Sequence, residues 1–150
     1  DIVMTYSLPQ VDKLSLGFNW DHGRAKNNGI NTAVGSEGFN SSDSSAHWWA
    51  AVVYAMYDYT DNQQGAFRYE YFDDDDGAKA FGHSMYSLTY THNITIAENL
   101  LIRPEVRYNK YNVSDAQEEA GMGLSYTDGD GNVHNNDDET ILALGVEYVF

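Results

Sequence analysis

Apolar and polar residues alternate along most of this chain, and a period of two is typical of β-strands with one apolar face. Ile2, Met4 and Tyr6 alternate with Val3, Thr5 and Ser7 at the start, and the same pattern recurs to the end of the chain. The alternation predicts an all-β fold of seven strands, within the segments 2–8, 14–21, 46–59, 65–71, 86–91, 100–109 and 142–150. Helical periodicity is scarce.

The connections between these segments are of two lengths, and the lengths alternate. Three connections are short, at Pro9–Asp12, Thr60–Gln63 and Ala97–Asn99. The three between them are long, at about 22–45, 73–83 and 111–139. A soluble sandwich has no reason to place all its long loops at one end, whereas outer-membrane barrels have short periplasmic turns and long extracellular loops. The spacing therefore favours an antiparallel transmembrane β-barrel of the outer-membrane type.

The polar positions of the strands carry charged side chains, and in a barrel these positions point inward. We predict that one set of residues lines a pore: Asn19, Asp58, Arg68, Glu70, Arg103, Glu105, Arg107 and Glu147. Opposed charges in a water-filled lumen select solutes by charge and dipole. The alternative is a small barrel whose interior is filled by an ion-pair network, and barrel size decides between the two.

Aromatic side chains are abundant, with twelve Tyr, six Phe and three Trp, and they gather near the strand ends. Two belts at the two membrane interfaces would explain this distribution. We expect one belt near the long loops, from Trp20, Trp48, Trp49, Tyr71, Tyr86 and Tyr108. We expect the other near the short turns, from Tyr6, Tyr57, Tyr59, Phe67, Tyr90, Tyr148 and Phe150.

Composition narrows the function further. The chain has 150 residues, which suits one domain, and a net charge of −15 from 8 basic and 23 acidic side chains. Such acidity argues against a nucleic-acid partner. The absence of cysteine excludes disulfides and thiol nucleophiles. The loops 73–83 and 111–139 carry net charges of −3 and −8, so most of the acidity lies at the long-loop end.

Strand parity bears on completeness, because closed bacterial barrels generally have an even number of strands. Seven strands mean either that an upstream strand is missing or that the strand count within 111–139 is incorrect. We expect the first, so that the chain is the C-terminal portion of a larger barrel and forms a single domain over residues 1–150. Pro104 falls within a predicted strand, where it removes a ladder hydrogen bond. We therefore expect a local bulge at Pro104.

Several segments together resemble a known family. The ending Gly145-Val-Glu-Tyr148-Val-Phe150 is similar to the C-terminal signature of bacterial outer-membrane barrels, with Ala143 where a polar residue is usual. Lys13–Asp21, Tyr54–Asp61, Arg68–Asp73 with Gly77, and Leu101–Asn109 resemble the putative β-barrel porin-2 family, in the family's order. The resemblance implies an outer-membrane location in Gram-negative bacteria, a pore, and insertion by the barrel-assembly machinery, with Gly145, Tyr148 and Phe150 as the assembly signal.

Motifs for a cofactor or an enzyme are weak. Asp128-Gly-Asp130-Gly-Asn132 begins like a calcium loop with Glu139 at its twelfth position, but Val133 stands where the sharp turn needs glycine. We expect no cofactor, and leave open loosely bound Ca²⁺ or Mg²⁺ at the acidic loops, including Asp73–Asp76. His22, His47 and His83 fall near the long-loop ends of strands and are candidates to approach one another. No nucleophile elbow or phosphate-binding glycine loop is present.

Three functions from different classes remain open. The first is an outer-membrane porin-like channel for passive diffusion of small hydrophilic solutes or ions, with no enzymatic activity. The second is a structural outer-membrane barrel that serves as a sleeve or anchor for a partner. The third is a soluble acidic β-sandwich that binds a ligand or calcium. For the first, the expected partners are outer-membrane lipid and lipopolysaccharide, the assembly machinery and small solutes, with a protein partner or oligomer left open. The long loops would then be extracellular and the C-terminus periplasmic.

Overall fold

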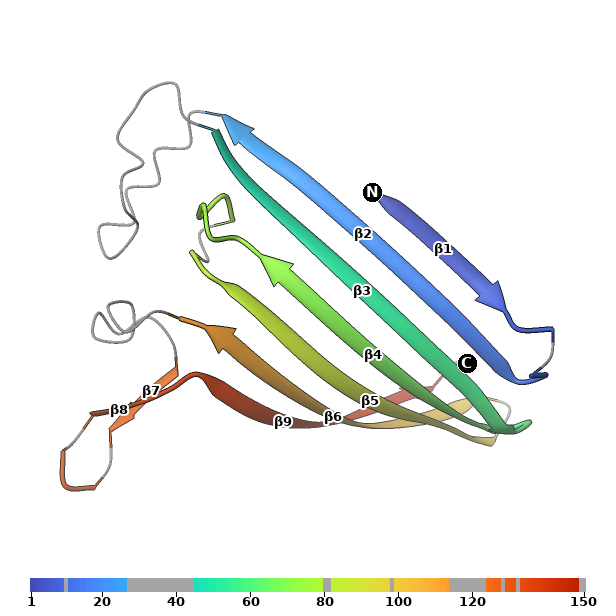
Figure 1. Ribbon diagram of the computed structural model, residues 1–150. Coiled ribbons are helices and arrows are strands. Elements are labelled where there is room, and N and C mark those ends of the chain that lie inside the picture. Colours follow the sequence, from blue (N-terminus) through green and yellow to red (C-terminus); the bar gives the residue numbers. More distant parts are fainter. Residues whose placement is uncertain are drawn as a thin grey trace.

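The computed structural model contains nine β-strands and describes residues 1–9, 11–26, 45–79, 82–97, 99–113, 124–127, 129–131 and 133–148 (Figure 1). No helix in these ranges is long and apolar enough to cross a bilayer. The strands are β1 (Ile2–Ser7), β2 (Leu14–Lys26), β3 (Ser45–Thr60), β4 (Gln63–Asp73), β5 (Ser84–Ala97), β6 (Leu100–Asn112), β7 (Leu124–Thr127), β8 (Val133–Asn136) and β9 (Asp138–Tyr148).

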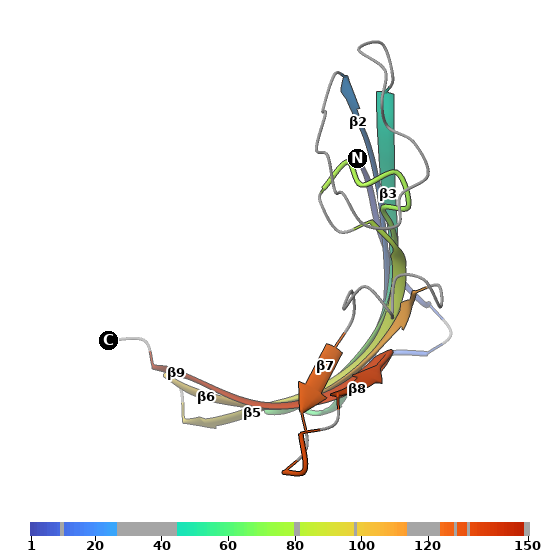
Figure 2. The same cartoon turned by 90° about the vertical axis from the view of Figure 1, so that its left-hand side faces the viewer.

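Seven strands form one antiparallel sheet in the order β1-β2-β3-β4-β5-β6-β9, which confirms the predicted all-β fold and strand number. Each strand of this sheet pairs with the next one along the chain, except that β6 pairs with β9. The two strands between them in the sequence, β7 and β8, form a separate hairpin. The sheet is a single curved layer and is not closed, because β1 and β9 form its two edges (Figure 2).

The strands are longer at the long-loop end than the alternation predicted. The expected loop of about 22–45 was wrong at its first end, because β2 continues to Lys26, whereas β3 begins at Ser45, close to the predicted position. Residues 111–139 were also wrong as one long loop, since β6 runs to Asn112 and β7 and β8 pair within this segment. Backbone pairing continues at this end although the apolar-polar alternation has stopped, with His22 opposite Trp49 and Arg24 opposite His47.

The expected bulge at Pro104 is absent, because the register on both sides of this residue is continuous. Pro104 pairs with Leu144 of β9, and toward β5 the ladder stops at Thr91–Glu105 and resumes in the same register at Ile94–Ile102. A proline that lacks its N–H on one side interrupts that ladder without adding a residue. The register shifts instead at Asp58/Thr60 and Thr95/Ala97, beside two short turns.

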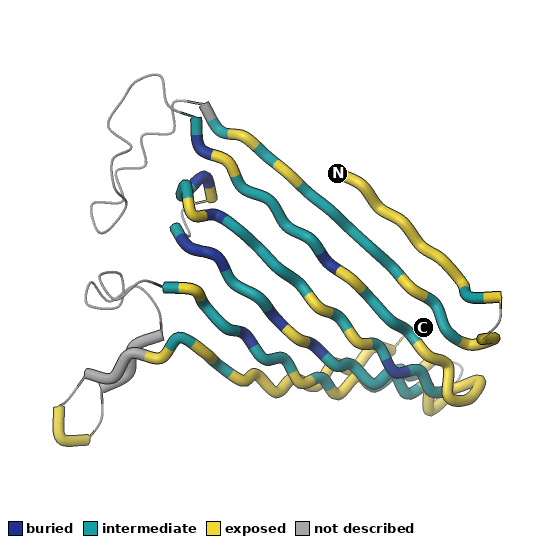
Figure 3. The backbone as a smooth tube through the Cα atoms, viewed as in Figure 1, coloured by how far each residue is buried: buried dark blue, intermediate teal, exposed yellow. Residues whose placement is uncertain are grey.

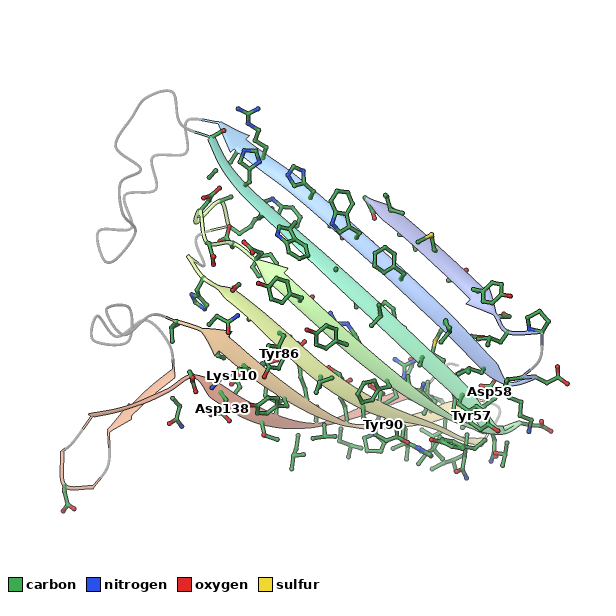
Figure 4. The ribbon with its side chains drawn as sticks, in the orientation of Figure 1. Tyr57, Asp58, Tyr86, Tyr90, Lys110 and Asp138 are labelled. Carbon is green, nitrogen blue, oxygen red and sulfur yellow. The ribbon has the colours of Figure 1, made fainter. Side chains whose placement is uncertain are left out.

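Exposed and less exposed residues alternate along the strands (Figure 3), and the two faces of the sheet differ in chemistry. The convex face carries large apolar side chains that are exposed, among them Leu142 at 80% and Leu144 at 69%. On the concave face, polar side chains of the central strands are buried, with Ser87 at 0% and Asn109 at 3%. Figure 4 labels Tyr57 on β3 and Tyr86 and Tyr90 on β5, all on the convex face.

Three glycines within or beside the ladders are covered by an aromatic side chain of a neighbouring strand. A Cβ atom at Gly17 would lie 3.2 Å from Tyr54 Cδ2, and one at Gly65 would lie 2.7 Å from the Tyr59 hydroxyl. A Cβ at Gly23 would lie only 2.1 Å from Trp48 Nε1. Glycine is therefore favoured at these positions, most strongly at Gly23, because it lets a ring lie against the backbone of the adjacent strand.

Candidate functional site

All eight residues predicted to line a pore lie on the concave face. Residues paired across the strands form rows, and side chains in one row point to the same face. Arg68 pairs with Thr89 and Thr89 with Arg107, so both arginines stand in one row, roughly 10 Å apart across β5. The next row contains Val52, Glu70, Ser87, Asn109 and Glu139. The charges are therefore arranged in bands across β4, β6 and β9.

Glu70 is the centre of this arrangement because it contacts both arginines. Its Oε2 lies 2.6 Å from Arg68 Nη2 and 3.8 Å from Arg107 Nη2, and it accepts a hydrogen bond from Ser87 Oγ at 3.3 Å. The Glu70 side chain is only 19% exposed, so these interactions are less screened than those on an open surface. One carboxylate thus holds two guanidinium groups that would otherwise repel each other.

A second branch extends from Arg107 to the edge strand β9. Arg107 Nε donates to Asn109 Oδ1 at 2.8 Å, and Asn109 Nδ2 donates to Glu139 Oε1 at 2.7 Å. Tyr111 also donates to Glu139 Oε1, at 2.6 Å. We name the connected set the inner polar network; its members are Arg68, Glu70, Ser87, Arg107, Asn109, Tyr111 and Glu139. It spans the consecutive strands β4, β5 and β6 and reaches β9, so that it joins residues 68 and 139.

The sequence-based prediction missed four members of this network: Ser87, Asn109, Tyr111 and Glu139. Glu139 was assigned to a loop, but it lies in β9 opposite Asn109. Its position inside the sheet follows from the β6–β9 register, which sequence alternation does not supply. Ser87 and Asn109 fall in phase with Arg68 and Arg107, so the alternation itself contained a signal for them.

Four of the predicted residues lie on the same face but outside this network, nearer the short turns. Glu105 accepts a hydrogen bond from Thr91 at 2.8 Å, and Arg103 lies 3.4 Å from the Glu147 carboxylate in an exposed pair. Asp58 accepts a hydrogen bond from Gln64 at 2.8 Å. Asp58, Gln64, Asn93 and Arg103 help to line an open depression of about 300 Å³.

Asn19 is set apart on β2. Its Nδ2 lies 3.3 Å from Asp21 Oδ2, and its buried Oδ1 has no hydrogen-bond partner among the described residues. The concave side of β1 to β3 otherwise presents mainly small or uncharged side chains, such as Thr5, Gly17 and Val52. Charge on the concave face is thus concentrated toward the β9 side.

The comparisons with known proteins agree with this geometry. Residues 1–150 match the family described as putative beta-barrel porin-2, OmpL-like, over the whole chain. The chain belongs to this family. No curated protein and no solved structure matches it at a significant level.

Membership in the porin-2 family explains why the convex face exposes apolar side chains while polar side chains are buried on the concave face. Members are outer-membrane β-barrels and are normally not enzymes. In such barrels an apolar band faces lipid and the interior is polar. The resemblance noted in the sequence is confirmed, and the single-layer sheet with a polar concave face is the arrangement this class of protein requires.

Two residues of the expected assembly signal lie in β9 of this porin-2 protein. Gly145 is on the concave face opposite Arg103, whose Cβ would lie 3.4 Å from a Cβ placed on the glycine. Tyr148 is on the convex face and 52% exposed. Phe150 lies outside the described residues, and the role of all three in assembly stays a prediction.

Most aromatic residues of the two expected belts lie on the convex face, but Trp48 does not. Trp49 pairs with His22 and contacts Tyr71 at 5.1 Å between ring centroids, with the rings tilted by 37°, on the convex side. Trp48 pairs with Gly23 and contacts Phe72 at 6.2 Å, on the concave side. The two tryptophans are adjacent in sequence, so strand geometry sends them to opposite faces, and the assignment of Trp48 to a belt was wrong.

Histidines and carboxylates do not assemble into a metal centre in the described ranges, where no group of three such side chains is placed to hold an ion. His22 and His47 approach to 5.7 Å between ring centroids, whereas His83 contacts Tyr111 at 5.8 Å. Asp128 and Asn132, in the calcium-like segment, lie outside the described residues. Metal binding at the acidic loops therefore stays a prediction.

Proposed function

We propose that this protein is an outer-membrane channel through which small hydrophilic solutes or ions diffuse passively. The observation that carries the proposal is the inner polar network on the concave face of a sheet whose convex face is exposed and apolar. A polar wall of this kind is what a water-filled lumen requires. Membership in a porin family supports the same conclusion.

The orientation follows the usual arrangement of this class. We propose that the short turns β1–β2, β3–β4 and β5–β6 are periplasmic and that the acidic long loops are extracellular. Carboxylates at that mouth would enrich cations and make the channel mildly cation-selective at low salt, with little selectivity at 1 M salt, where the screening length is only about 3 Å. Bridging of the same carboxylates to lipopolysaccharide through Mg²⁺ or Ca²⁺ would weaken this effect.

Conductance of the complete protein in planar bilayers tests the proposal. We expect stepwise single-channel currents and a reversal potential that indicates cation preference under a low-salt KCl gradient, shifted by a chelator if divalent ions are bound. Correctly inserted protein without current would contradict the channel and would favour a structural barrel. Anion preference at low salt would mean that Arg68 and Arg107, not the acidic mouth, determine the sign.

A further inference from the structure

The connection between β4 and β5 is folded into a compact unit around one aspartate. The Asp74 side chain is fully buried, and its carboxylate oxygens accept the Lys79 backbone N–H at 2.9 and 3.1 Å and the Gly82 N–H at 3.4 Å. The Gly77 N–H donates to the Asp74 carbonyl at 2.7 Å, and Gly77 has a positive φ of 68°, which favours glycine. These hydrogen bonds therefore hold the segment 74–79 in a defined conformation.

This segment lies on the concave side of the sheet. Lys79 Nζ stands 4.6 Å from the centroid of the Trp48 ring, and Trp48 is a concave-face residue of β3. An ammonium group above an indole is a favourable cation–π arrangement. Ala78, next to Lys79, is 8% exposed. The segment thus packs inward at the long-loop end.

A hydrogen bond from the backbone of β3 to a side chain of the segment holds the segment near the beginning of this strand. The ladder between β3 and β4 ends where Trp49 pairs with Asp73. Beyond that point, Asp76 Oδ2 accepts the His47 backbone N–H at 3.0 Å. The Asp76 side chain therefore supplies a hydrogen-bond acceptor to β3 beyond the point where its pairing with β4 ends.

Trp48 is itself held from the other side by glycine. The indole lies against Gly23 of β2, where a Cβ would come within 2.1 Å of Nε1, and contacts Phe72 of β4. Gly23, Trp48 and Lys79 thus form a stack that rises from the concave face. Because the stack and the segment 74–79 lie on the concave face, they would occupy part of a lumen bounded by this face.

We propose that the segment 74–79, seated on Trp48, is the constriction of the channel at its long-loop end, and that Lys79 is the residue there that discriminates solutes by charge. The inference rests on the proposed channel function. Lys79 is the one basic side chain in the acidic stretch 73–79, beside Asp75 and Asp76. A permeating ion would pass a cation and carboxylates within one short segment, and such closely spaced charges control selectivity.

Cysteine modification tests the position of Lys79 because the chain contains no native cysteine. The complete protein carrying Lys79→Cys is recorded in a planar bilayer while a bulky thiol reagent is added to one side and then the other. We expect a stepwise loss of current on modification, and expect Lys79→Ala alone to raise cation preference. Lys110→Cys and Lys110→Ala are matched controls, because Lys110 is at the same end but on the convex face.

A second measurement tests the docking without any current. In detergent micelles, a maleimide should react slowly with Ala78→Cys and faster when Trp48→Ala is added, while Gly129→Cys, in open surroundings, should react fast in both backgrounds. Fast reaction of Ala78→Cys with Trp48 intact would overturn the docked segment. Current unchanged by full modification of Lys79→Cys would overturn the constriction while leaving the channel standing. Absence of current from the unmodified protein would reject the channel and the constriction together.

Discussion

The convex and concave faces of this sheet reverse the burial rule of soluble proteins. On the central strands β5 and β6, the convex residues Leu88 and Val106 are 36% and 40% exposed. On the concave face, Ser87, Thr89 and Asn109 are nearly fully buried although they are polar. In water, exposure of the apolar convex side chains would cost free energy, and nothing would require polar side chains at the buried concave positions. The difference shows that the two faces are built for two solvents, lipid outside and water or polar groups inside.

The comparison also shows how little sequence distance separates the two environments. Ala143 and Leu144 are adjacent, yet Ala143 lies opposite Glu105 in the row below the arginines and Leu144 lies opposite Pro104 on the apolar side. Substitutions at neighbouring positions should therefore have very different consequences.

A charge on the convex face should be the most damaging change. Leu144 is the central member of the aliphatic run on β9, so Leu144→Arg places a guanidinium in the apolar band and should destabilise the inserted protein by about 2–4 kcal/mol. Denaturant unfolding in lipid vesicles measures the loss. Ala143→Arg, one residue away and facing Glu105, is the control and should cost much less. Equal losses at the two positions would contradict the assignment of faces.

Removing the centre of the inner polar network should have the next largest effect. Glu70→Gln keeps the shape of the side chain but withdraws the charge that holds Arg68 and Arg107, and should cost about 1.5–3 kcal/mol. Glu147→Gln is the control, because its pair with Arg103 is exposed on both sides and should contribute below about 1 kcal/mol. The same unfolding titration compares the two, and an equal or greater cost for Glu147→Gln would show that the network is not cooperative.

A methyl group at Gly23 should test how tightly the concave face is packed. Gly23→Ala must displace the Trp48 indole, and overpacking of this kind costs about 1–3 kcal/mol. The shift should also be visible as a change in tryptophan fluorescence. Gly129→Ala meets nothing within 4 Å and should leave both stability and fluorescence unchanged. A neutral Gly23→Ala would mean that the indole moves freely.

The smallest effect should be a pH dependence of the segment 74–79. Partial burial raises the pKa of Asp75 above its usual 3.8, and repulsion from Asp73 raises it further. Between the pKa of Asp75 in the unfolded segment and its higher pKa in the folded segment, the folded segment binds a proton that the unfolded one has released. The stability of the folded segment therefore falls as pH rises through this window. Hydrogen exchange of the Gly77 and Lys79 amides, corrected for intrinsic rates, should show slower exchange below the window. Asp75→Asn should remove this dependence, and a dependence that persists would assign it to another group.

The fold could be predicted largely from alternation because the strands are amphipathic in the region where the two solvents differ. The phase of Leu14, Leu16 and Phe18 against Ser15 and Asn19 places each residue on the face the structure shows. At the long-loop end both faces carry polar residues, such as His22 and Arg24, so the pattern fades and the strand ends were missed. The β7–β8 hairpin was not predicted, because residues 111–139 were expected to form one long acidic loop, although the Asp-Gly pairs in this segment are a hairpin signal.

The side-chain contacts could be predicted only in part. The phase identifies Arg68, Glu70 and Arg107 as neighbours on one face, but their distances depend on the registers of β4 with β5 and of β5 with β6. Glu139 required the register of β6 with β9, which is set across a long connection. Trp48 was misplaced because Ala46–Tyr57 is apolar on both faces, so that composition does not show which phase points inward.

The β7–β8 hairpin has a consequence for the order in which the sheet forms. Every other strand pair is joined directly along the chain, whereas β9 must find β6 across the segment from Asn112 to Asp138. Pairing of Leu124–Thr127 with Val133–Asn136 takes up about half of that segment before the two long strands meet. Halving the free length of a loop reduces its closure cost by about 0.6 kcal/mol. A small hairpin outside the main sheet thus shortens the search that brings β9 to β6.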